Sequence, residues 1–84
     1  MRLEERLERH LGKEPETGAA VYVAKSAELI GDVKLSKNSS VWPQCVLRGD
    51  INSIELGEGS NLQDGVIVHL SDDFGVKVGK YVTV

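Results

Sequence analysis

VAKSAELIGDVKLSKNSSVWPQCVL, residues Val23–Leu47, is the stretch of sequence that decides the fold. Its aliphatic residues recur at a fixed step of six. The same step continues along the chain with two interruptions, through Val23, Leu29, Leu35, Val41 and Leu47, then Leu56, Leu62 and Val68, then Val78 and Val84. This period differs from the about 3.6 residues per turn of an α-helix and from the alternation of a half-buried strand. It is typical of a repeat whose hexads each supply a short strand and a turn, with three hexads closing one triangular coil of about 18 residues.

A second set of small or aliphatic residues follows most of these positions by four, namely Ala27, Val33, Ser39, Cys45, Ser60, Val66 and Val82. We expect both sets to point into the coil, the aliphatic residues lining the core and the small ones lying where it narrows. The sequence therefore predicts an all-β domain, a parallel β-helix over residues 21–84. Cys45 belongs to the inward set, so we interpret it as a buried, inert thiol.

The N-terminal segment has a different pattern. Leu3, Leu7 and Leu11 recur every four residues, which predicts a short amphipathic α-helix over residues 1–11 that docks by its leucine stripe. His10 lies in this helix, so we do not expect it to be a metal ligand. Gly12, Pro15 and Gly18 break the helical pattern, so residues 12–20 are interpreted as a linker.

The two interruptions of the repeat predict outward loops, because extra residues cannot stay in a tight coil. The first adds three residues around 50–53, and the second adds four around 71–74. Counting along the repeat pairs Leu47 with Val68, which makes Arg48 and His69 neighbours one coil apart. On spacing alone, His69 is open to two interpretations, a surface histidine or a functional one. The charged residues Lys25, Asp32, Lys34 and Lys37 are predicted to be solvated corners.

Composition narrows the classes of partner. With 84 residues and a formal net charge of −3, the chain is at most one small domain and has no electrostatic affinity for nucleic acid or an anionic membrane. It lacks an apolar run of the roughly 20 residues that a spanning helix needs, and it lacks a secretory signal pattern. A single cysteine suits a reducing compartment, so we predict a cytoplasmic protein. Its small core favours oligomerisation.

LRGDINSIELGEGSNLQDGVIVH, residues Leu47–His69, resembles the signature of the γ-class carbonic anhydrases and their relatives, an RGD followed by a QDG turn and a histidine. The resemblance extends back to Ile30 and forward to Val84. It implies a left-handed β-helix, which is an exception to the usual right-handed crossover. It also implies a homotrimer that acts on carbon dioxide and bicarbonate.

The resemblance also implies roles for particular residues. His69 would be the first ligand of zinc, or of another divalent transition metal such as iron or cobalt. Gln63 would lie beside the metal-bound water. Arg48 and Asp50 match the family pair implicated in trimer contacts and active-site organisation, and Asp64 would lie in the same network.

The sequence departs from the family pattern at two points. Three histidines normally complete the site, two from one subunit and one from its neighbour, and only His69 is present here. We therefore expect an N-terminal portion of a longer protein with an incomplete metal site and no activity of its own. Asp72 and Asp73 are the local substitutes for the family's proton-transferring acids. Two alternatives stay open, a hexapeptide-repeat acyltransferase using an acyl-coenzyme A donor and a non-enzymatic trimeric scaffold.

Overall fold

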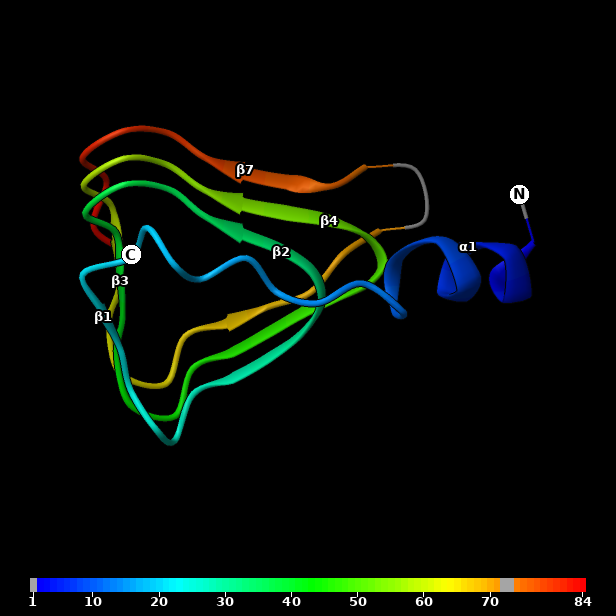
Figure 1. Cartoon of the computed structure of the whole chain (residues 1–84), viewed down its shortest axis with the longest axis horizontal. Helices are drawn as coiled ribbons and strands as arrows, with labels where there is room; N and C mark the ends of the chain where they lie inside the picture. Colours follow the sequence, from blue (N-terminus) through cyan, green and yellow to red (C-terminus); the bar gives the residue numbers. More distant parts are fainter. Residues whose placement is uncertain (1, 72–73) are drawn as a thin grey trace.

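The computed structural model describes residues 2–71 and 74–84, which are mostly β-structure after one short helix. The elements are α1 (Leu3–His10), β1 (Tyr22–Val23), β2 (Glu28–Leu35), β3 (Ser40–Val41), β4 (Val46–Leu56), β5 (Asn61–Leu62), β6 (Ile67–Val68) and β7 (Val76–Val78). Every strand pairing in the described part of the chain is parallel. Figure 1 shows the chain winding through three-sided coils that stack on one another.

The strand registers follow the predicted repeat. One side of the coil is the sheet β1-β3-β5, and another is β2-β4-β6, while β7 pairs with the far half of β4. Leu29 pairs with Leu47, a separation of 18 residues, as the repeat predicts. Val68 in turn pairs with Leu47, a separation of 21, because this coil contains the three inserted residues. The parallel winding agrees with the predicted β-helix.

The first insertion is a bulge at one corner of the coil. Gly31 pairs with Gly49, and the next pair is Val33 with Ile54, so Asp32 alone lies opposite residues 50–53. The strand bends here and passes from one side of the coil to the next, as bulges commonly allow. The predicted location of the insertion is therefore confirmed. The second predicted insertion includes Asp72 and Asp73, which lie outside the described residues.

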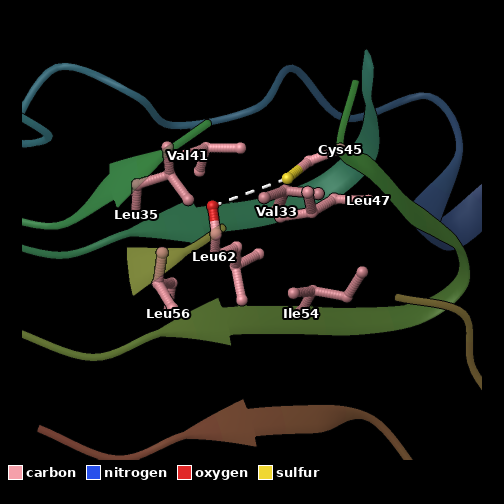
Figure 2. Close-up of a cluster of buried hydrophobic side chains, with 8 residues drawn as sticks. All are labelled: Val33, Leu35, Val41, Cys45, Leu47, Ile54, Leu56 and Leu62. Carbon is pink, nitrogen blue, oxygen red and sulfur yellow. Dashed lines mark hydrogen bonds between the residues drawn. The ribbon is translucent and has the colours of Figure 1, made fainter. Parts of the chain in front are cut away.

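The core is a single column of aliphatic side chains inside the coils (Figure 2), made of Val33, Leu35, Val41, Cys45, Leu47, Ile54, Leu56 and Leu62. Most of these belong to the two predicted inward sets. Ile54 belongs to neither set, because the bulge moves the inward position and the count of six passes over it. Val82 and Val84 were predicted to point inward but are 39% and 50% exposed.

The small inward positions carry polar groups that are satisfied inside the coil. The Ser39 hydroxyl donates to the carbonyl of Ser36 at 2.7 Å. The Ser60 hydroxyl donates to the carbonyl of Gly79 and accepts the amide N–H of Val82 at 2.8 Å. The Cys45 thiol donates to the carbonyls of Leu62 and Gln63, at 3.5 and 3.0 Å. No buried side-chain nitrogen or oxygen in the described residues lacks a partner, which the low-dielectric interior requires.

Helix α1 lies outside the triangular coil, beside the corner at which β4 bends (Figure 1). The predicted leucine stripe docks the helix only in part, since Leu7 is half-buried whereas Leu3 and Leu11 are 58% and 45% exposed. The helix contacts β4, and His10 at its last turn binds Asp32 of β2. The prediction that Asp32 is solvated was therefore wrong, because α1 covers this corner. Among the described residues, no helix is long and apolar enough to cross a bilayer.

The stretch after α1 joins the sheet before β1 begins. Glu16 forms a parallel bridge with Lys34, accepting from the amide of Leu35 and donating to the carbonyl of Val33. This bridge extends the side of the coil formed by the second halves of β2 and β4. It lies within residues 12–20, the predicted linker, so that part of the segment is held against the coils.

Candidate functional site

Arg48 and Asp50 form an ion pair on the outer surface of β4. Because side chains alternate along a strand, residues two apart project to the same side. The Nη2 and Nε atoms of Arg48 donate to Oδ2 of Asp50 at 3.1 and 3.3 Å. The side chain of Arg48 is 54% exposed and that of Asp50 is 18% exposed. An ion pair with one exposed member contributes about 0–1 kcal/mol to stability, so the fold depends little on it.

His69 directly follows β6 and is exposed. The last pair of the β4–β6 register is Leu47 with Val68, so His69 occupies the next position along the column after Arg48. The predicted adjacency of Arg48 and His69 on successive coils is confirmed at the level of the backbone. The structure therefore brings Arg48, Asp50 and His69 to one corner of the coil.

Gln63 lies at a different corner, in the turn after β5. Its side-chain Nε2 donates to Oδ1 of Asn61, and Nδ2 of Asn61 donates to Oγ1 of Thr83 at 3.2 Å on the next coil. The backbone carbonyl of Gln63 accepts the Cys45 thiol from inside the coil. Asn61 was missed by sequence reasoning, although its position two residues before Gln63 on the same side of the strand is a signal that could have found it.

Asp64 is exposed in the same turn, beside Gly65. Within the described residues, no hydrogen bond or ion pair joins Asp64 to Arg48 or Asp50. Gln63 and His69 lie at opposite ends of the segment that contains β6. A single chain therefore gathers the predicted site residues at two corners, one holding Arg48, Asp50 and His69, the other Gln63 and Asp64.

The donor set fits one ligand of a metal site. His69 offers an exposed imidazole, the group that divalent transition metals commonly bind. No group of three or more His, Cys, Asp and Glu residues in residues 2–71 and 74–84 is arranged to hold a metal ion. His10, the other histidine, has its Nδ1 2.6 Å from Oδ2 of Asp32. Asp72 and Asp73 lie outside the described residues, so their proximity to His69 stays a prediction.

Comparison with known proteins gives a consistent group of relatives. No protein-family model matches the chain. It is 47% identical over 76 residues to gamma carbonic anhydrase 2, mitochondrial, of Arabidopsis thaliana, covering 83% of this chain and 27% of that protein. It is 42% identical over 64 residues to a probable carbonic anhydrase of Methanocaldococcus jannaschii, covering 76% of this chain and 40% of that protein.

A solved structure supports the fold. The crystal structure of a hexapeptide transferase family protein from Anaplasma phagocytophilum is similar with a TM-score of 0.78 and 43% sequence identity, over 87% of this chain and 42% of that one. The chain thus spans less than half the length of these relatives. The likeness supports a β-helix of hexapeptide repeats.

Proposed function

Since the chain is homologous to the γ-class carbonic anhydrases, we propose that it contributes to a metal-dependent, trimeric protein that interconverts carbon dioxide and bicarbonate. The observation that carries the proposal is the corner where the Arg48–Asp50 ion pair lies one coil from His69. This corner combines a fixed charged pair with an exposed imidazole on rigid strands. We further propose that the coils wind in the left-handed sense of the family.

In this proposal His69 is a metal ligand, with the metal zinc or another divalent ion such as iron or cobalt. When bound, such an ion supplies Lewis-acid activation of water for hydration of carbon dioxide. Its remaining ligands would come from outside the described residues, a neighbouring subunit among them. Arg48 and Asp50 fix the subunit interface, because a charged pair sets the register of a contact more than its strength.

Gln63 and Asp64 act at the second corner. We propose that trimer formation brings this corner of one subunit to the His69 corner of the next, so that one shared site contains both sets of residues. The hydrogen bonds from Gln63 to Asn61 and from Asn61 to Thr83 hold the Gln63 amide in one orientation. The bond to Asn61 uses one N–H of the Gln63 amide, so its second N–H can donate a hydrogen bond and its oxygen can accept one from water or substrate.

A second candidate function is acyl transfer, which is favoured by the likeness to a hexapeptide transferase family protein. Such an enzyme would use His69 at a subunit cleft with an acyl-coenzyme A donor and would need no metal at that histidine. Metal content therefore distinguishes the two functions. Metal binding without hydration of carbon dioxide would instead favour the non-enzymatic trimeric scaffold.

The test is the metal content of the full-length protein with His69→Ala, measured by elemental analysis after exhaustive dialysis. We expect stoichiometric zinc in the parent and its loss in the variant. Ile67→Ala is the matched control, because Ile67 is 65% exposed and lies two residues earlier on the same side of β6. Retention of one metal per subunit by His69→Ala would show that His69 is not a ligand.

Two further expectations accompany the proposal. The division into residues 1–11, 12–20 and 21–84 stays a prediction for how the chain is organised. A cytoplasmic location also stays a prediction, and the Arabidopsis relative has mitochondrial in its name.

A further inference from the structure

His10 and Asp32 form a contact across the junction of helix and coil that the proposed function does not use. Nδ1 of His10 and Oδ2 of Asp32 are 2.6 Å apart, and their side chains are only 13% and 20% exposed. Because an ionised carboxylate only accepts hydrogen bonds, Nδ1 carries the proton and donates it. Lys13 also donates to the same oxygen, at 3.3 Å from an exposed position.

The contact lies directly above the backbone that carries the Arg48–Asp50 ion pair. Asp32 is the residue opposite the bulge at 50–53, and its backbone is packed on Gly49 so closely that a Cβ at Gly49 would lie 2.5 Å from the Asp32 carbonyl oxygen. The end of α1 packs on the same corner, since a Cβ at Gly31 would lie 2.8 Å from the carbonyl oxygen of His10.

We propose that His10 and Asp32 are positioning residues for the Arg48–Asp50 pair. Their hydrogen bond latches α1 to the corner, and the latched helix holds the strand backbone at Gly49 in the conformation from which both charged side chains project. The importance of that pair rests on the proposed function, whereas the positioning itself depends only on the contacts above. Helix α1 also contacts β4, the strand that carries Arg48 and Asp50, so a change in the position of α1 can be transmitted to β4.

The test uses nuclear magnetic resonance on the 84-residue chain, with two readouts for each variant. Amide hydrogen exchange over residues 7–11 reports whether α1 is docked. The Nε–H resonance of Arg48, which donates to Asp50, is the spectroscopic signature of the ion pair. The variants are His10→Phe, which keeps a ring but removes the donor, Asp32→Ala, and the two combined.

We expect each single variant to lower exchange protection of α1 by about tenfold, the effect of losing one hydrogen bond to a charged group. Solvent exchange of the Arg48 Nε–H should rise by a similar factor. The double variant should match the single ones, because the two residues act as one contact. Two controls should leave the Arg48 signal unchanged. Glu8→Gln is on the exposed side of α1, and Val78→Ala truncates a half-buried side chain that packs on the core and pairs with Leu56, at the other end of β4.

Three results would overturn the proposal. An undocked helix with an unchanged Arg48 signal would show that the latch does not position the pair. Unchanged exchange protection of α1 in the single variants would show that the His10–Asp32 hydrogen bond does not dock the helix. A double variant whose free-energy change is twice that of either single variant would show that the two residues act separately. No metal or substrate is involved, so failure here is distinguishable from failure of the proposed metal site, which the zinc content of His69→Ala measures.

Discussion

Gly49 lies between Arg48 and Asp50 in the RGD motif. The structure indicates that a side chain is excluded at this position by the neighbouring backbone. A Cβ built at Gly49 would lie 2.5 Å from the Asp32 carbonyl oxygen, 2.7 Å from its carbon and 2.9 Å from its nitrogen. All three are backbone atoms of the coil above. Gly49 is not among the glycines with positive φ, so the conformation itself would accept alanine. We therefore predict that Gly49→Ala destabilises the fold by contact alone.

The size of the effect follows from the displacement needed. Ordinary van der Waals contact begins near 3.4 Å, whereas the Cβ of an alanine at position 49 would lie 2.5 Å from the Asp32 oxygen. The backbone at residue 49 or at residue 32 would therefore have to move by 0.9 Å. Overpacking in a well-packed region costs about 1–3 kcal/mol, and a contact with backbone on both sides belongs at the upper end. For a domain of this size, about 3 kcal/mol lowers the Tm by roughly 12–24 °C.

Thermal unfolding followed by circular dichroism measures the shift, with two other glycines as controls. Gly18 has nothing within 4 Å and no positive φ, so Gly18→Ala should leave the free energy of unfolding within about 0.5 kcal/mol. Gly65 also has open space but a φ of +75°, so Gly65→Ala should cost about 1–2 kcal/mol through conformation alone. A Gly49→Ala variant as stable as Gly18→Ala would refute the close stacking of coils at this corner.

Two other predictions concern assembly and reactivity. Arg48→Ala should weaken a trimer, because it removes one member of an interfacial charged pair; we expect sedimentation to show a dissociation constant about tenfold higher or more. The control is Lys34→Ala, which removes an exposed cation on the adjacent strand. A trimer of Arg48→Ala as stable as the parent would contradict the interface role. The Cys45 thiol, fully buried, should react with a thiol reagent at least about a thousandfold more slowly in the native protein than in denaturant, because reaction requires opening of the coil. Equal rates would show that Cys45 is accessible.

The fold could be predicted because a repeat fixes both the inward positions and the columns by counting alone. That count placed Leu47 against Val68, and hence Arg48 next to His69, without any knowledge of contacts. The count failed at Ile54, because the bulge shifts the inward position and the six-residue spacing of the aliphatic residues does not predict that shift. The columns therefore hold wherever the coil is regular and need a structure where it is interrupted.

The candidate site was predictable to the same extent. Arg48 and His69 were placed correctly relative to each other, whereas Gln63 and Asp64, which were expected in the same site, lie at another corner of the coil. Contacts between the repeat and other segments were not predicted. The hydrogen bond of His10 to Asp32 joins a helix to a corner 22 residues away, and no periodicity relates the two. The orientation of Gln63 by Asn61 likewise depends on side-chain rotamers, which a pattern of polar and apolar residues does not determine.

The bulge at residues 50–53 has a consequence for how such a chain can change its length. The pairs on either side of it, Gly31 with Gly49 and Val33 with Ile54, keep the same inward and outward faces although the number of intervening residues differs between the two strands. The number of residues at this corner can therefore change without altering the register of the strands on either side of it. Engineered insertions there should add a loop beside the Arg48–Asp50 pair while leaving the hydrophobic column intact, which makes this corner the natural place to graft new binding sequences.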